Sequence, residues 1–310
     1  MQVVRSMMLA AVVTTLACGS VFAQEIPMEG PVPTTALVRA ESKGGAPLDA
    51  NALKLEVNGH GMPVESITPV SRGKAQLAIL VDDGLRSSFA NQISEIQQFV
   101  RDLPPGVEVL IGYMQNGGVR SEDHFSANHE EALRVLRIPF SSVGASASPY
   151  FCLSEFVKHW PSQEPAARFV LMLTNGVDPY NGSVSPLNQS SPYVERAQED
   201  AQAAGVAVYS IYYGDRGERG NAVAFSGQGY LQQVGSATGG DSFNNGTISP
   251  PSISPYLRLF SRAISESYLV SFRAPMNRRD RNDLARIKLK TSQSGVKIHA
   301  PDSVRVGLVE

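Results

Sequence analysis

The sequence predicts an α/β protein with a doubly wound, mainly parallel central sheet flanked by helices, and a small β-module formed by strands from both ends of the chain. Three observations favour this fold class. Short apolar runs bounded by glycine, such as residues 77–81, are typical of strands buried on both faces. Segments with a helical spacing of apolar residues follow these runs in alternation, as in βαβ units. Toward both ends of the chain, apolar and polar residues alternate instead, as in half-buried strands.

Length and charge exclude several classes of protein. The 310 residues, of which 42% are hydrophobic, suffice for one large domain or two small ones. The formal net charge of −2 is too balanced for nucleic acid or an anionic membrane to be the main partner. We therefore expect no nucleic-acid partner.

Residues 1–23 have the pattern of a secretory signal peptide. Arg5 supplies the positive start, residues 7–17 form the apolar core, and Val-Phe-Ala at 21–23 is a cleavage site of the small-x-small type. The alternative is an uncleaved anchor, but the apolar run is shorter than the ~20 residues that a membrane span needs. We expect a mature chain that begins at Gln24, is secreted or periplasmic, and has no membrane span.

The two cysteines have different expected fates. Cys18 resembles the acceptor of a lipoprotein signal, but Leu16 lies one position too close to it, so lipid anchoring is not expected. Signal cleavage leaves Cys152 alone and excludes an intramolecular disulfide. Because Cys152 lies in the apolar pattern of a helix, we interpret it as a buried, inert thiol.

The mature chain begins with two segments before the main domain. Residues 24–48 are rich in Pro, Gly and Thr and are expected to be a flexible lead-in. Residues 49–73 are expected to supply the N-terminal β-strands of an accessory module. Apolar and polar residues alternate over 53–57, an Asn-Gly pair then favours a hairpin turn, and a second strand follows over 63–70.

The main domain is expected to span residues 74–266. In its first half, Pro104-Pro105-Gly106 ends one helix, and Asn128, followed by two glutamates, caps another. In its second half, Gly205 closes a helix after a long polar loop. The expected strands are 77–82, 107–114, 119–125, 168–174, 206–213 and a short edge strand at Phe243. The expected helices are 89–102, 128–137, 149–160, 192–204, a short one after a Gly-rich loop at 214–229, and 254–266.

Residues 267–310 return to the β pattern. Strands are expected over 268–272, 285–291 and 296–300, and we expect them to pair with the N-terminal strands in a small sandwich. The basic run 278–281 between the first two is interpreted as a solvated hairpin tip, the alternative being a patch for an acidic partner.

Several motifs in the main domain occur in a characteristic order. They are the first strand ending in Asp82, residues 109–113, 170–176 and 205–211, and Tyr230-Leu231 followed by Thr238-Gly239-Gly240. In this order and spacing, residues 74–266 resemble a von Willebrand factor A (VWA) domain, and the flanking strands are similar to those of secreted bacterial "VWFA-related" proteins. The resemblance implies a Rossmann-like VWA fold and binding of a protein partner.

The same resemblance implies a candidate metal site. VWA domains often hold Mg²⁺ through a D-x-S-x-S motif, a threonine and a second aspartate, and leave one position for a carboxylate of the partner. Carboxylate, hydroxyl and water oxygens suit this hard ion. By this comparison the candidate ligands are Asp82, Ser146 in place of the threonine, and Asn175 in place of the second aspartate.

The sequence departs from that motif. Gly84 and Arg86 stand where the two serines belong. An arginine about 4 Å from the ion would repel Mg²⁺ by several kcal/mol, so we expect a degenerate site without metal, in which Arg86 could pair with Asp82. A distorted site completed by neighbouring polar residues is the alternative. The candidates for that role are Asp83, Ser87, Ser88 and Asp178, and the candidates for contact with a partner are these four residues and Arg86.

We therefore expect a non-enzymatic protein-interaction module that needs no cofactor and binds an unidentified protein through the polar loops at the strand ends. Those loops are 82–88, 116–118, 144–149, 175–190 and 214–229. One alternative is a Mg²⁺-dependent adhesion domain with Asp82 and Ser146 as ligands. The other is a secreted hydrolase using Ser87 or Ser88 with His124, although the chain lacks a G-x-S-x-G motif.

An aromatic group follows Pro149. Tyr150, Phe151, Phe156 and Trp160 lie on one expected helix and are interpreted as core residues, the alternative being an exposed strip that binds a partner.

Overall fold

The computed structural model describes residues 30–185, 187–214, 220–275 and 284–309. Residues Pro31–Glu310 belong to one compact unit. The expected signal peptide, with Cys18, and the basic run 278–281 lie outside the described residues. Among the described helices, none combines the length and the apolar character that a membrane crossing requires.

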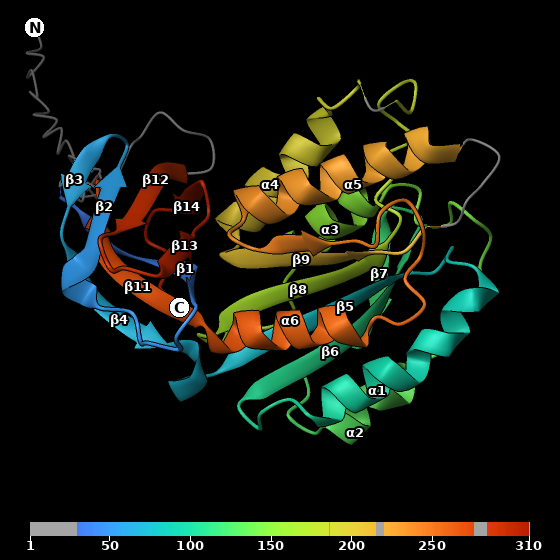
Figure 1. The fold of residues 1–310 in the computed structure, drawn as a ribbon, viewed down its shortest axis with the longest axis horizontal. Helices are drawn as coiled ribbons and strands as arrows, with labels where there is room; N and C mark the ends of the chain where they lie inside the picture. The colour runs from blue at the N-terminus through green and yellow to red at the C-terminus, as the bar shows by residue number, and fades with distance from the viewer. Residues whose placement is uncertain (1–29, 186, 215–219, 276–283, 310) are drawn as a thin grey trace, which may run out of the picture. The chain divides into compact units, whose positions relative to one another are not determined.

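The central sheet has six strands in the order β10-β9-β8-β5-β6-β7 (Figure 1). The strands from β10 to β6 pair in parallel, and only the edge strand β7 is antiparallel. The expected doubly wound, mainly parallel sheet is thereby confirmed. The strands are β5 (Ala75–Asp82), β6 (Val107–Gln115), β7 (Gly118–Ser121), β8 (Ala167–Thr174), β9 (Val206–Tyr212) and β10 (Asp241–Phe243).

Strand β5 is buried on both sides because helices cover both faces of this sheet. Leu77 and Ile79 pack into one apolar cluster with α1 and α6, whereas Ala78 and Leu80 pack into another with α3, α4 and α5. The helices of this region are α1 (Ile93–Arg101), α2 (His129–Ala132), α3 (Pro149–Lys158), α4 (Pro192–Ala203), α5 (Gly220–Ala237) and α6 (Ser254–Ser265), with short 3-10 helices at Ser87–Gln92 and Leu133–Val135.

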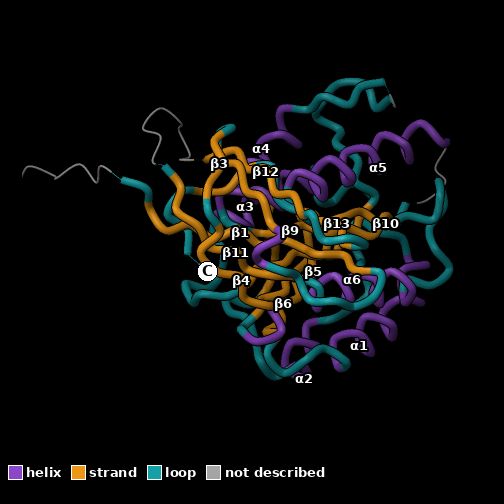
Figure 2. Tube along the Cα trace, turned by 60° about the vertical axis from the view of Figure 1, so that its left-hand side comes forward, coloured by secondary structure: helices purple, strands orange, loops and turns teal. Residues whose placement is uncertain are grey.

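The N- and C-terminal strands form two further four-stranded sheets, β13-β1-β11-β4 and β14-β12-β2-β3. Figure 2 draws the strands in orange. Strands β4 and β2 pair with β11 and β12, as expected from the sequence. A third apolar cluster, which includes Val38 and Phe272 from one sheet and Val57 and Ala285 from the other, lies between them. The strands are β1 (Val32–Ser42), β2 (Leu53–Val57), β3 (His60–Met62), β4 (Val64–Pro69), β11 (Ser267–Ala274), β12 (Leu284–Thr291), β13 (Val296–His299) and β14 (Ser303–Arg305), with 3-10 helices at Ala50–Ala52 and Val70–Arg72.

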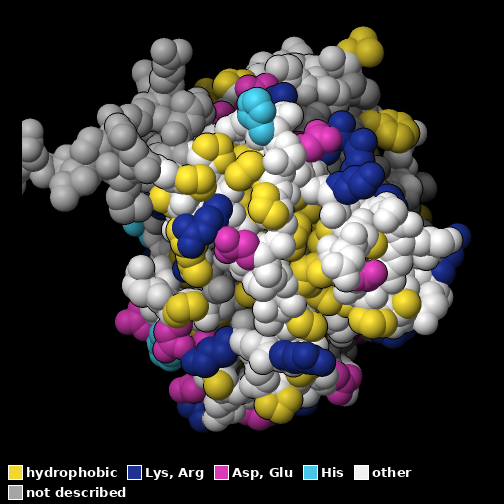
Figure 3. Space-filling model, turned by 90° about the vertical axis from the view of Figure 1, so that its left-hand side faces the viewer, with side chains coloured by type: hydrophobic (Ala, Val, Ile, Leu, Met, Phe, Trp, Pro, Cys, Tyr) yellow, Lys and Arg dark blue, Asp and Glu magenta, His cyan; other side chains and the backbone are white. Residues whose placement is uncertain are grey.

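The surface of these two sheets is chemically mixed. Strand β12 alternates buried and outward-facing residues, and Arg286, Lys288 and Lys290 face outward. Figure 3 shows this side of the molecule, where hydrophobic side chains lie between scattered basic and acidic ones.

The expectation of a flexible lead-in over 24–48 is wrong for the part that forms β1. This eleven-residue strand pairs with β11 over Val32 to Arg39. Apolar and polar residues do not alternate in β1 because both of its faces are buried. Val38 packs between the two four-stranded sheets, and Leu37 packs against the core of the central sheet. The Pro, Gly and Thr content of the segment therefore misled the sequence interpretation.

The expectation of a Gly-rich loop over 214–229 is also wrong, because α5 begins at Gly220. Two of its glycines serve close packing and not a turn. A Cβ atom on Gly227 would lie 2.0 Å from the carbonyl oxygen of Asn175, and one on Gly229 would lie 2.2 Å from Oε1 of Gln189. Helical glycine costs about 1 kcal/mol relative to alanine, and here that cost is offset by the close approach of the helix to the loop after β8.

Candidate functional site

The candidate site lies at the edge of the central sheet where β5, β6, β8 and β9 end, with the residues that follow each strand. We call this edge, with loops 83–86, 116–117, 136–148, 175–191 and 213–214, the crown. In open α/β sheets, ligands bind at the carboxyl ends of the strands. The crown is therefore where the sequence-predicted site residues should meet.

Asp82, the last residue of β5, is buried and fully engaged with protein donors. Its Oδ1 accepts a hydrogen bond from the backbone N–H of Gly84 at 3.0 Å. Its Oδ2 accepts one from the hydroxyl of Thr174 at 2.9 Å and one from the hydroxyl of Ser146 at 3.2 Å. Burial raises the pKa of Asp82, and these three donors oppose that rise.

Gly84, which the resemblance places at the first serine of the metal motif, lies in a crowded position. A Cβ atom at this position would lie 2.8 Å from the carbonyl oxygen of Ser142 and 3.0 Å from the backbone nitrogen of Gly144. The loop before α3 thus occupies the space that a serine side chain would need. Only glycine fits unless that loop moves.

Asp83 is buried beside Asp82, but its carboxylate faces a different set of groups. Nη1 of Arg137 contacts Oδ1 at 2.5 Å, the hydroxyl of Ser141 donates to Oδ2 at 2.6 Å, and the amide of Gln115 also donates to Oδ2. Burial by itself raises the pKa of Asp83, but the hydrogen bonds from Arg137, Ser141 and Gln115 and the charge of Arg137 lower it overall.

The cation beside this carboxylate is therefore Arg137, which sequence reasoning missed. The guanidinium of Arg137 lies 3.8 Å from the ring centre of Tyr113 and 4.1 Å from that of Phe140. The hydroxyl of Tyr113 donates to the carbonyl oxygen of Arg137 at 2.7 Å. Arg137 lies 54 positions after Asp83 in the chain, and no local pattern marks it as a partner.

The other proposed site residues are dispersed. Asn175 uses its side-chain oxygen to accept a hydrogen bond from the backbone of Val177 at 3.0 Å. Asp178 is buried and accepts from the hydroxyl of Ser191, the N-cap of α4, at 2.8 Å. Arg86 and Ser88 are exposed, whereas the side chain of Ser87 lies outside what the structure describes.

The candidate ligands Asp82, Ser146 and Asn175 are not arranged as an octahedral Mg²⁺ site requires. The ion prefers several oxygen ligands together with retained water molecules. Both oxygens of Asp82 already accept protein hydrogen bonds, Gly84 provides no hydroxyl, and Asp83 is ion-paired with Arg137. The structure does bring Asp82 and Ser146 together, but it turns Asn175 toward Val177.

Exposed apolar side chains gather at the crown. Ile138, Phe140 and Val143 extend from the loop before α3, and the exposed fractions of Phe140 and Val143 are 74% and 70%. Tyr180 and Leu187 lie in the loop after β8. At the start of α4, Tyr193 forms an aromatic group with Tyr180 and with Phe151 of α3. We call Ile138, Phe140, Val143, Tyr180, Leu187 and Tyr193 the crown patch.

The helix after Pro149 has the expected character for most of its aromatic residues. Tyr150, Phe156 and Trp160 are buried, which confirms the core interpretation, whereas Phe151 is only half-buried beside the crown patch. Cys152 is also buried, and burial raises the pKa of its thiol to about 12, as expected for an inert thiol.

His124, the base of the hydrolase alternative, is exposed. Its Nδ1 lies 2.8 Å from a carboxylate oxygen of Asp123, and this contact raises its pKa. Ser88 lies in the 3-10 helix that precedes α1. The structure shows no hydrogen bond between the described atoms of His124 and Ser88.

No family model and no curated protein matches the chain. Among solved structures, the chain is similar to the conserved hypothetical protein BatB from Bacteroides thetaiotaomicron, with 15% identity, a TM-score of 0.44, and coverage of 62% of this chain and 98% of that chain. It is also similar to an aerotolerance-related membrane protein from Bacteroides fragilis, with 11% identity, a TM-score of 0.44, and coverage of 61% and 98%.

A third similar structure is the VWA domain of SpRpn10, with 10% identity, a TM-score of 0.41, and coverage of 62% of this chain and 97% of that domain. The VWA-like fold of the chain rests on its own strand order, with five parallel strands, one antiparallel edge strand and helices on both faces.

Proposed function

We propose that the protein is a secreted or periplasmic, non-enzymatic protein-interaction module that binds a protein partner through the crown patch without a metal ion. The observation that supports this proposal is the number of exposed apolar side chains at the edge of the sheet where Asp82 and Asp83 already have partners within the protein. Of the nine large apolar residues that are exposed in the described part of the chain, six belong to the crown patch.

The composition of the patch suits a binding surface. Aromatic residues and arginine contribute most to binding at protein interfaces. Phe140 is exposed but lies against the guanidinium of Arg137, which is in turn held by Asp83. The ring is therefore presented in a restricted orientation, and less conformational entropy is lost when a partner binds it.

The proposal is tested with wild-type protein and a Phe140→Ser, Val143→Ser double variant. Partners are captured from the native envelope or secretome by cross-linking, and direct binding of each captured protein is then measured by calorimetry. Leu259→Ser is the matched control, because Leu259 is an exposed apolar residue on α6 and not in the crown patch.

The expected result is a partner that the wild type and the Leu259 variant bind equally and that the double variant binds at least about tenfold more weakly. The affinity should not change when EDTA is added. A partner bound equally by all three proteins would overturn the role of the crown patch.

A Mg²⁺-dependent adhesion domain is the second candidate. It is favoured by Asp82 and Ser146, which lie within hydrogen-bonding distance at the end of β5. In that case the partner's carboxylate would complete the coordination of the ion, and EDTA would abolish binding. The response to EDTA therefore separates the two functions.

A further inference from the structure

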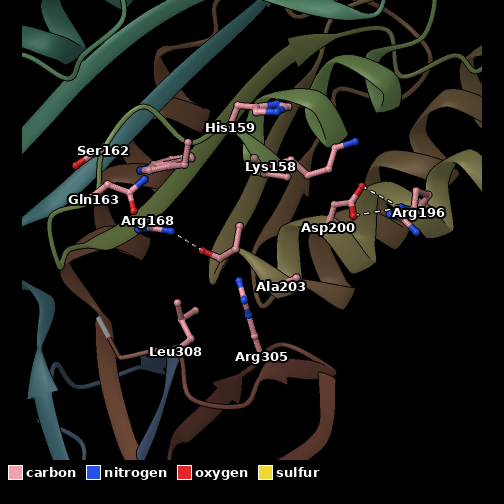
Figure 4. Close-up of a pocket in the computed structure, with 13 residues that line it drawn as sticks. Lys158, His159, Ser162, Gln163, Arg168, Arg196, Asp200, Ala203, Arg305 and Leu308 are labelled. Atoms are coloured by element: carbon pink, nitrogen blue, oxygen red, sulfur yellow. Dashed lines mark hydrogen bonds and ion pairs between the residues drawn. The ribbon is translucent and has the colours of Figure 1, made fainter. Parts of the chain in front are cut away.

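A cavity lies at the opposite edge of the central sheet from the crown, where β8 begins and where α3 and α4 end. We call it the basal cavity; its volume is about 640 Å³, within the range of small-ligand sites. Its walls include Trp160 after α3, Arg168 of β8, the end of α4, and Arg305 and Leu308 near the C-terminus (Figure 4).

The lining of the basal cavity is strongly cationic for a chain with a net charge of −2. Four of the described lining residues carry a permanent positive charge, and the single carboxylate among them belongs to Asp200. That carboxylate already contacts Arg196 at 3.2 Å and the hydroxyl of Ser154 at 2.5 Å. Lys158 contacts the carboxylate of Glu155 at 3.7 Å, and Arg168 and Arg305 are the two cations at the end of the cavity away from Asp200.

These two arginines point into the cavity from opposite walls (Figure 4). Nη1 of Arg168 donates to the carbonyl oxygen of Ala204 at 3.0 Å, and its guanidinium carbon lies 5.6 Å from the ring centre of Trp160. Arg305 ends β14, where it pairs with Leu284. Both guanidinium groups are thus attached to regular structure, which favours bidentate binding of an anion with little reorganisation.

The C-terminal wall is held in place by backbone contacts. The backbone N–H of Thr35 donates to the carbonyl oxygen of Leu308 at 2.8 Å, and the N–H of Leu308 donates to the carbonyl oxygen of Arg305. The apolar side chain of Leu308 lines the cavity beside the two arginines. The cavity therefore offers an apolar surface next to its cationic end.

We propose that the basal cavity binds a peptide segment of a partner through a carboxylate that lies between Arg168 and Arg305. The walls offer an apolar surface as well as cations, because Leu308 lies beside the two arginines. A peptide carries apolar side chains beside its carboxylate and can use both kinds of group, whereas phosphate and sulfate ions offer only polar oxygens. The carboxylate can come from a chain terminus or from an Asp or Glu side chain. This site is independent of the proposed function of the crown patch.

The test uses the mature full chain and short synthetic peptides in titration calorimetry. One peptide has a free C-terminus and no acidic side chain, a second has two glutamates and a blocked C-terminus, and a third is neutral and blocked at both ends. Inorganic phosphate and sulfate are titrated in parallel. Either carboxylate peptide should bind with a Kd below about 1 mM and more tightly than the neutral peptide and the inorganic ions. The peptide that binds identifies the source of the carboxylate.

Arg305→Gln should weaken this binding by roughly tenfold or more, because it removes one charged donor, and added salt should weaken binding to the wild type. Arg305 is exposed, so this variant should fold; Arg168→Gln should act in the same direction. Arg120→Gln, an exposed arginine on β7, is the matched control and should bind as the wild type does.

The proposal would be overturned if neither carboxylate peptide bound, or if the wild type and both cavity variants bound the peptides equally. It would also be overturned if inorganic phosphate or sulfate bound as tightly as the peptides. The Phe140→Ser, Val143→Ser variant of the crown should bind the peptides normally. A failure of the basal cavity is therefore distinguishable from a failure of the crown patch.

Discussion

The hydroxyl of Thr174 donates a hydrogen bond to Asp82 at 2.9 Å and so connects the end of β8 to the end of β5. The two strands are parallel neighbours, and their last residues therefore lie side by side. Asp82 thus accepts a hydrogen bond from within the protein. The predictions below concern Asp82, Asp83 and the residues in contact with them.

Thr174→Val should destabilise the fold by about 1–3 kcal/mol, because it removes a donor to the buried carboxylate of Asp82 and the acceptor of the Gly176 backbone N–H while keeping the side-chain shape. Thr174→Ser keeps the hydroxyl and is the control, with a smaller loss expected. Denaturant unfolding of the three proteins measures the difference. A valine variant as stable as the wild type would show that the hydrogen bond contributes nothing.

Gly84→Ser, which restores a residue of the metal motif, should destabilise the protein by about 1–3 kcal/mol because the new Cβ meets the loop at Ser142. Gly44→Ser is the control, since no atom lies within 4 Å of a Cβ built there. Thermal unfolding with and without Mg²⁺ measures both effects. A Gly84 variant that gains stability in Mg²⁺ would contradict this account and indicate a recoverable metal site.

The wild-type protein should melt at nearly the same temperature in EDTA and in millimolar Mg²⁺, Mn²⁺ or Ca²⁺. A metal ion stabilises a fold only if it binds the native state. In this protein both carboxylate oxygens of Asp82 already accept hydrogen bonds from other residues. Differential scanning fluorimetry makes the comparison. A rise of many degrees with any of these ions would favour the Mg²⁺-dependent adhesion function instead.

Asp83 should make stability depend on pH in the acidic range. Its pKa is lowered in the folded state, so its stabilising contribution is present above the unfolded pKa of about 3.9 and is lost as the pH falls. Asp83→Asn should be less stable than the wild type at neutral pH, by about 1–3 kcal/mol, since Arg137 loses its partner. This difference should shrink between about pH 5 and pH 2.

Denaturant unfolding at several pH values measures this effect, with Glu122→Gln, a change at an exposed carboxylate, as the control. A constant difference between the wild type and Asp83→Asn across this range would exclude the proposed titration. A difference that grows as the pH falls would have the wrong sign.

The order of the central strands and helices could be predicted because each depends on local pattern. The apolar run that ends at Asp82, the cap at Asn128 and the start of α6 at Ser254 are all readable within a few residues. Strand β1 was missed because burial of both faces removes alternation, and the start of α5 was missed because glycine is read as a turn residue.

The sequence by itself therefore determined the fold class, the position of Asp82 at the end of a buried strand and the absence of serine at positions 84 and 86. The tertiary structure alone decided which groups contact the two carboxylates, namely the hydroxyls of Thr174 and Ser146 for Asp82, and the guanidinium of Arg137 for Asp83. The physical reason is that hydrogen bonds and ion pairs depend on distances of about 3 Å. Folding sets such distances between residues 54 to 92 positions apart, and no local sequence pattern encodes them.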